Sequence, residues 1–86
     1  MGDSVKLAKI AERQLGKLDP QVQRRIGELT ERLESLADPR AIGEALHGDL
    51  KEFWKYRAGD WRLVASIHDS VLVVEVIEIV HRSTAY

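Results

Sequence analysis

The first half of the chain carries apolar residues at the spacing of two amphipathic helices. In the first helix, expected from about Lys9 to Lys17, the apolar face consists of Ala11, Leu15 and Leu18. In the second, apolar residues repeat at i, i+4, i+7, i+11 and i+14, and they are Val22, Ile26, Leu29, Leu33 and Leu36. Such a stripe is typical of a helix that packs by one face on a core. Asp19 and Pro20 suit the N-cap and first position of this helix, and Asp38-Pro39 ends it.

The opposite side of the second helix is strongly charged. It carries Arg24, Arg25, Glu28, Glu31, Arg32 and Glu34. We interpret this side as a solvent-exposed surface with pairs of opposite charge four residues apart, such as Glu28–Arg32.

Alternating or continuous apolar runs in the remainder of the chain predict strands. A short strand is expected at about Ser4–Ala8, and three more at about Leu50–Arg57, Asp60–His68 and Val71–Val80. A tight turn at Asp69-Ser70 would join the last two strands as a hairpin, and residues 40–49 read as a loop with one helical turn. The order predicts an α+β fold, in which an N-terminal strand and a two-helix hairpin pack on one face of a small antiparallel β-sheet. The other face is then free for function.

The strand expected at Leu50–Arg57 has an unusual distribution of charge. Alternation points Leu50, Trp54 and Tyr56 to one side, and the other side carries Lys51, Phe53, Lys55 and Arg57. Like charges two residues apart on a strand repel each other, so folding alone gives little reason for this row. Binding of a polyanion would explain why the cations are aligned. We therefore predict that these cations, with Arg62 and Arg82 of the following strands, form one phosphate-binding surface.

Composition limits the classes of function. The 86 residues form one expected domain (1–86), large enough for a modest core, and are 44% hydrophobic and 31% charged. The absence of cysteine excludes disulfides and thiolate metal sites and suits a reducing, cytoplasmic location, and the three scattered histidines have no metal-ligand spacing. No membrane segment, signal peptide or cofactor is expected. With a formal net charge of −1, the chain would bind nucleic acid only weakly without a specific site.

The sequence resembles the RelE branch of the RelE/ParE toxin superfamily over nearly its whole length. The resemblance lies in DPQVQRRI, the LHGDLKEFWKYRAGDWRLV block, the apolar last strand and the ending HRSTAY. It implies a toxin of a type II toxin–antitoxin pair that enters the ribosomal A site and cuts mRNA there. The implied partners are the ribosome, the mRNA and a cognate antitoxin.

The resemblance also implies a catalytic set. Carried over position by position, the set is Lys55, Arg57, Arg62, Arg82 and Tyr86, with His81 as an alternative acid. RNA cleavage without a metal proceeds by attack of the 2′-OH on the adjacent phosphorus, which needs a base, an acid and cations for the transition state. Arginine suits the non-bridging oxygens, and Lys55 beside other cations would have a lowered pKa. Which residue is the acid and which the base stays open.

Each of these residues also has a plainer explanation. Arg62 could pair with Asp60 or Glu78, His81 could be a polar residue at a strand end, and the two tryptophans could simply pack on the core. Two other functions remain open: a ParE-like inhibitor of DNA gyrase, and a degenerate toxin that only binds its antitoxin. For the antitoxin we expect an amphipathic helix or strand with acidic contacts, docked at Arg40–Gly48 or at the sheet edge.

Overall fold

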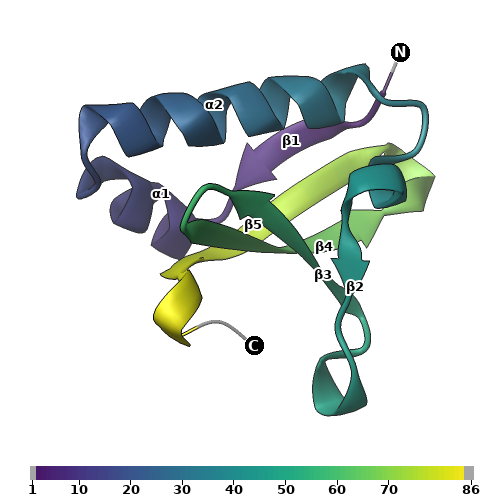
Figure 1. Cartoon of the computed structure of the whole chain (residues 1–86). Helices are drawn as coiled ribbons and strands as arrows, with labels where there is room; N and C mark the ends of the chain where they lie inside the picture. Colours follow the sequence, from purple (N-terminus) through teal and green to yellow (C-terminus); the bar gives the residue numbers. More distant parts are fainter. Residues whose placement is uncertain (1, 85–86) are drawn as a thin grey trace.

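Two helices cover one face of a five-stranded sheet, as Figure 1 shows. The computed structural model describes residues 2–84. Its elements are β1 (Ser4–Leu7), α1 (Lys9–Gly16), α2 (Pro20–Ser35), β2 (Glu44–Ala45), β3 (Phe53–Ala58), β4 (Trp61–His68) and β5 (Val73–His81). Short 3-10 turns lie at Pro39–Ile42, Gly48–Leu50, Asp69–Val71 and Arg82–Thr84. The predicted α+β class, with both helices on one face, is confirmed.

The sheet has the strand order β1-β5-β4-β3-β2. Strands β3 to β5 form the expected antiparallel meander, and β2 also pairs antiparallel with β3. In contrast to the antiparallel sheet that was expected, β1 pairs parallel with β5 and places Ser4 opposite Val73. A parallel pair needs a long crossover between its strands, and the helical hairpin together with β2, β3 and β4 provides it. The sequence pattern located β1 correctly, and the direction of its pairing was set by this connection.

The two helices form where the apolar spacing placed them. Ala11 of α1 and Ile26 and Leu33 of α2 are each no more than 1% exposed, so the predicted core faces are confirmed. The predicted cap of α2 is wrong in one detail, because the Asp19 side chain accepts no capping hydrogen bond. Instead, the Asp19 carbonyl accepts the amide of Gln23 at 2.9 Å and thereby begins the helical ladder.

The core lies between these helices and the sheet. Its sheet side consists of Tyr56, Ala58, Leu63, Ala65, Val74, Val76 and Ile79. Trp54 and Trp61 pack against this cluster, which confirms that both tryptophans are packing residues. The side chains that alternate with these residues therefore belong to the face that the helices leave uncovered.

The first strand of the meander is shorter than expected. Leu50 ends a 3-10 turn and β3 begins only at Phe53, so Lys51 is not part of the row of strand cations. The expected loop before it contains the two-residue strand β2, which the sequence did not indicate. The connection of β4 to β5 is also longer than a two-residue turn, since it continues through Leu72 in the left-handed region at φ 53°.

Strand β5 contains an irregularity that reverses the alternation of its side chains. Val76 and Glu78 face adjacent residues of β4, so Ile77 between them has no partner there. Val76 is buried before this bulge and Ile79 after it. Without the bulge, strict alternation would carry Glu78 into the core. With it, Glu78 lies on the uncovered face and His81 on the helix-covered face.

Candidate functional site

Three of the predicted cations lie together on the uncovered face of the sheet. Arg57 on β3 is directly opposite Arg62 on β4, and Lys55 is opposite Val64. Directly opposed residues have their Cβ atoms about 5 Å apart, and residues two apart on a strand share a face. The backbone therefore brings Lys55, Arg57 and Arg62 to neighbouring positions, as the alternation predicted.

The side chains of Arg62 and Arg57 differ in exposure and in hydrogen bonding. Arg62 is only 9% exposed, and its Nη1 donates hydrogen bonds to the carbonyls of Gly59 at 2.8 Å and Trp61 at 3.0 Å. The guanidinium thus curls back over the β3–β4 turn and fixes it. Arg57 by contrast is exposed. Of the two paired arginines, Arg57 is the one that solvent and a phosphate can reach.

Arg82 is held beside the same turn. It begins the last 3-10 turn, and its backbone amide donates to the carbonyl of Asp60 at 2.7 Å. Its Nε lies 3.5 Å from Oδ1 of Asp60, and both side chains are 65% exposed. A pair this exposed contributes little to stability, but it orients the Arg82 side chain. Asp60, considered above as a partner of Arg62, therefore pairs with Arg82.

His81 does not lie with the cations. The bulge in β5 turns it to the helix-covered face, where it is opposite Trp61. The two rings meet edge-on, with centroids 5.2 Å apart and an interplanar angle of 85°. His81 Nδ1 accepts the amide of Ser83 at 3.2 Å and lies 2.9 Å from the Ser83 hydroxyl. The imidazole thus stabilises the end of β5, and a proton on the neutral ring resides on Nε2. Tyr86, the other predicted proton donor, lies outside the described residues.

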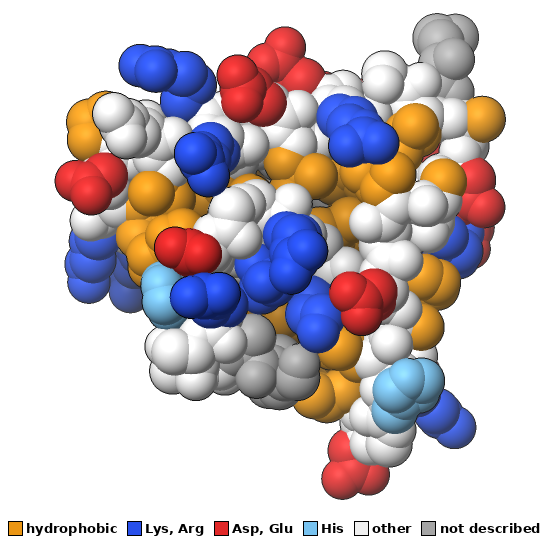
Figure 2. Space-filling model, in the orientation of Figure 1, with side chains coloured by type: hydrophobic (Ala, Val, Ile, Leu, Met, Phe, Trp, Pro, Cys, Tyr) orange, Lys and Arg blue, Asp and Glu red, His pale blue; other side chains and the backbone are white. Residues whose placement is uncertain are grey.

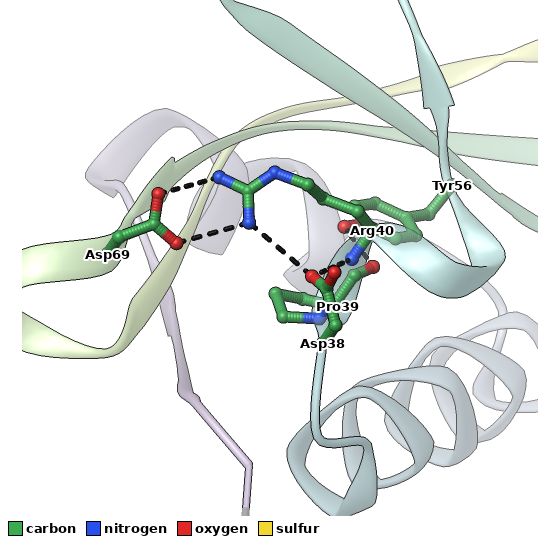
Figure 3. A network of polar contacts seen from close by, with 5 residues as sticks. All are labelled: Asp38, Pro39, Arg40, Tyr56 and Asp69. Atoms are coloured by element: carbon green, nitrogen blue, oxygen red, sulfur yellow. Dashed lines mark hydrogen bonds and ion pairs between the residues drawn. The ribbon is translucent and has the colours of Figure 1, made fainter.

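A polar network that the sequence did not reveal lies at the far end of the sheet (Figure 3). Arg40 donates to both carboxylate oxygens of Asp69, at 3.1 and 2.7 Å, and reaches Asp38 at 3.4 Å. Its guanidinium also lies 5.8 Å from the ring centroid of Trp54. The hydrogen bonds to Asp69, and to a lesser extent Asp38, raise the pKa of Arg40, and the hydrogen bonds from Arg40 lower the pKa of Asp69. The network ties the loop after α2 to the β4–β5 connection, and pairs so distant in sequence give no local signal.

Tyr56 anchors the same loop from below. Its hydroxyl donates to the carbonyl of Pro39 at 2.7 Å, and the residue is 1% exposed. Burial raises the pKa of Tyr56 to about 12, so the hydroxyl stays a donor at neutral pH. The network around Arg40 and Tyr56 is therefore structural and holds the loop after α2 against the helix-covered side of β3.

The charged side of α2 is not only a solvated surface. Arg25, Glu28 and Arg32 line a groove between α2 and the β3–β4 hairpin, together with Arg57. The expected ion pair between Glu28 and Arg32 is not formed, although both residues lie in the described part of the chain. Among residues 2–84 no three potential metal ligands gather. No helix in that range has the length and apolar composition to cross a membrane.

Comparison with known protein families shows to which family this chain belongs. Residues 5–86 match the family described as the ParE toxin of type II toxin–antitoxin systems, parDE. The chain belongs to the RelE/ParE toxin superfamily. Toxin RelE of Mycobacterium tuberculosis is 39% identical to this toxin over 51 residues, which are 59% of the chain. The match spans about half, 53%, of that relative's length.

Two solved structures show how closely the toxin follows the RelE fold. The toxin–antitoxin complex RelBE2 of M. tuberculosis matches with a TM-score of 0.86 and 26% identity, over 96% of this chain and 94% of that one. The archaeal RelE–RelB complex of Pyrococcus horikoshii OT3 matches with a TM-score of 0.76 and 28% identity, over 99% and 100% of the two chains. The resemblance to the RelE branch that the motifs indicated is thus confirmed.

Proposed function

We propose that this toxin is a ribosome-dependent endoribonuclease that cuts mRNA in the A site by attack of a 2′-OH on the adjacent phosphorus. The observation that supports this proposal is the grouping of Lys55, Arg57 and Arg62 on the uncovered face, with Arg82 oriented at its end by Asp60. Cations held in advance around one phosphate stabilise the charge that develops in the transition state.

The geometry suggests separate tasks within the set. Arg57 and Arg82 are exposed and carry planar guanidinium forks, so they are suited to the non-bridging phosphate oxygens. Arg62 acts as a positioning residue, because its hydrogen bonds fix the turn that carries Asp60, the partner of Arg82. Lys55 and Tyr86 remain the proposed groups for proton transfer. The ribosome would hold the mRNA in the reactive geometry, so we expect a weak nuclease in its absence.

We further propose that a cognate antitoxin neutralises the toxin in the cytoplasm. The two solved relatives described above are toxin–antitoxin complexes, which supports this partner. A second candidate activity is inhibition of DNA gyrase, which the description of the matching family as ParE favours. The third possibility is a degenerate toxin that retains only antitoxin binding.

Primer extension on a defined mRNA in programmed ribosomes tests the first proposal. We expect cuts within the A-site codon with the wild type and with Arg24→Ala, a control that removes an exposed arginine from α2. Arg82→Ala should lower the rate by roughly 100-fold, the usual cost of losing one transition-state donor. If wild type leaves the mRNA intact but alters gyrase supercoiling, the ribonuclease proposal is wrong. If the wild-type protein neither cuts mRNA nor alters supercoiling, and its expression does not arrest growth, the degenerate-toxin hypothesis replaces the ribonuclease proposal.

A further inference from the structure

The uncovered face of the sheet carries an aromatic side chain beside its cations. Phe53 lies on β3 two residues before Lys55, so both side chains point to the uncovered face. Phe53 is partly exposed and, among the described residues, is not one of the hydrophobic side chains that pack against the core. In Figure 2, Lys and Arg side chains gather over β3 and β4, with hydrophobic side chains exposed beside them. Packing of the core therefore does not account for an aromatic ring at this position.

A row of polar residues crosses the same face next to Phe53. In the register of the sheet, Phe53 is opposite Ser66 on β4, and Ser66 is opposite Glu75 on β5. Neighbouring strands are about 4.8 Å apart, so the ring, the hydroxyl and the carboxylate occupy adjacent positions. Residues two apart on a strand are separated by about 7 Å, which places this row next to that of Lys55 and one further row from Arg57.

The carboxylate of Glu75 is held in place by His68. Nε2 of His68 lies 3.3 Å from Oε1 of Glu75, and the two side chains are 45% and 42% exposed. A carboxylate has two oxygens with about four lone pairs, so one contact with an imidazole leaves acceptor capacity that faces solvent. A contact this exposed contributes little to stability. Its result is an oriented acceptor close to an aromatic ring, on the same face as the proposed RNA-binding cations.

We infer that this row is a base-binding subsite for single-stranded RNA, in which one base stacks on Phe53 and its exocyclic amino group donates to Glu75. The subsite rests on the function proposed above, because the cations at Lys55 and Arg57 would hold the adjoining phosphates. Aromatic side chains on an open sheet bind single-stranded RNA by stacking with unpaired bases, whose edges are then free for hydrogen bonds.

The chemistry of Glu75 predicts which bases the subsite accepts. An ionised carboxylate can only accept hydrogen bonds. Cytosine and adenine present an amino donor, and a glutamate side chain is suited to accept from the cytosine amino group. Uracil has a carbonyl oxygen in that place, whose lone pairs would face the carboxylate. The subsite should therefore favour cytosine over uracil, and these two bases form a matched pair of probes because they share one ring size.

NMR titration of the isotope-labelled full-length toxin with short oligonucleotides tests this inference. The probes are 2′-O-methyl tetranucleotides of cytosine and of uracil, which cannot be cut by 2′-OH attack, and an abasic strand of the same length. The titrations use about 50 mM salt, because phosphate contacts weaken as salt rises. We expect the cytosine strand to bind roughly tenfold more tightly than the uracil strand, the effect of one hydrogen bond to a charged group. It should also shift the ring signals of Phe53, which the abasic strand should leave in place.

Two substitutions separate stacking on the ring from recognition of the amino group. Phe53→Leu should weaken binding of the cytosine strand by roughly tenfold, because base–aromatic stacking is lost, and that of the abasic strand by less than about twofold. Glu75→Gln should reduce the preference for cytosine over uracil to less than about threefold, because an amide can both donate and accept. The control is Ile10→Ala, which alters an exposed apolar residue on α1 and should change neither quantity.

Any of three results would overturn the base-binding subsite. They are equal affinity of the wild type for the cytosine and uracil strands, Phe53 ring signals that do not move, and an abasic strand that binds as tightly as the cytosine strand. The test contains no ribosome and no cleavable bond, so it separates this inference from the ribonuclease proposal. A toxin that cuts mRNA but fails here loses only the subsite, whereas one that passes here but leaves mRNA intact loses only the ribonuclease.

Discussion

The imidazole of His81 packs edge-on against the indole of Trp61, on the opposite face of the sheet from Arg57 and Arg62. The motif His81-Arg82 therefore divides between two environments: the histidine belongs to the helix side, and Arg82 is tied to Asp60 at the β3–β4 turn. We infer from this separation that His81 supports the fold and does not transfer a proton.

Replacing His81 tests that separation. We expect His81→Gln to lower the free energy of unfolding by about 1 kcal/mol, since an edge-on aromatic pair is lost, and to leave A-site cleavage nearly unchanged. Urea denaturation and primer extension measure the two effects. A loss of cleavage as large as that of Arg82→Ala, with stability intact, would show that His81 takes part in the chemistry.

Arg62 and Arg57 form a matched pair for testing the role of buried arginine. Arg62→Lys should destabilise the toxin by about 1–2 kcal/mol, because the shorter, more strongly hydrated ammonium does not reproduce the position of Nη1, which donates to the carbonyls of both Gly59 and Trp61. Arg57→Lys, at an exposed position, should change stability by less than about 0.5 kcal/mol. Thermal unfolding of both variants provides the comparison. Equal stability of the two would mean that the Arg62 bonds do not hold the turn.

The Arg40–Asp69 pair should make a contribution to stability that depends on pH. Arg40 lowers the pKa of Asp69 through direct hydrogen bonds. A carboxylate whose folded pKa is depressed stabilises the fold above its unfolded pKa, near 3.9, and loses that contribution as the pH falls through the folded value. A double-mutant cycle with Arg40→Ala and Asp69→Asn should show favourable coupling at pH 7 and none near pH 2. Coupling that persists in acid would contradict this account.

Tyr56 should make the toxin sensitive to alkali. Its folded pKa of about 12 lies above the unfolded value of about 10. Its contribution is therefore complete below pH 10 and is lost as the pH rises through about 12. Tyr56→Phe should lower the free energy of unfolding by about 1–2 kcal/mol at pH 7, because the Pro39 carbonyl loses its buried donor. The difference between wild type and variant should narrow above pH 10, and a constant difference would refute the assignment.

Substitutions at Gly59 and Gly48 distinguish backbone strain from a steric clash with a neighbouring side chain. Both have positive φ, 62° and 65°, so alanine at either position should cost about 1–2 kcal/mol. A Cβ at Gly59 would also lie 2.6 Å from Nη1 of Arg25, whereas a Cβ at Gly48 meets nothing. Gly59→Ala should therefore also displace the Arg25 side chain, while Gly48→Ala should leave it in place. The NMR signal of the Arg25 Nε–H group in both variants tests this, and a signal unchanged in Gly59→Ala would contradict the displacement.

The spacing of apolar residues was sufficient to locate the helices and the meander. Ile26 and Leu33 are buried because a helix of that periodicity has one apolar side, and Trp54 and Tyr56 point to the core because a strand alternates. These are local consequences of backbone geometry, which is why they can be read from sequence. The same alternation placed Lys55, Arg57 and Arg62 on the uncovered face.

Pairing between distant segments decided what the alternation could not. The bulge at Ile77 reverses the faces of Glu78 and His81, and nothing in the apolar run of β5 marks it. From the sequence, a carboxylate was one expected partner of Arg62. In the folded chain the guanidinium donates instead to the carbonyls of Gly59 and Trp61 in the adjacent β3–β4 turn.

The sequence by itself determined the class of fold, the family resemblance and the residues that carry positive charge to one face, because periodicity and motif are properties of neighbouring residues. The tertiary structure alone decided which of those charges remain exposed. That outcome depends on strand register and on the approach of α2 to the edge of β3, where Arg25, Arg32 and Arg57 meet although 25 positions separate Arg32 from Arg57.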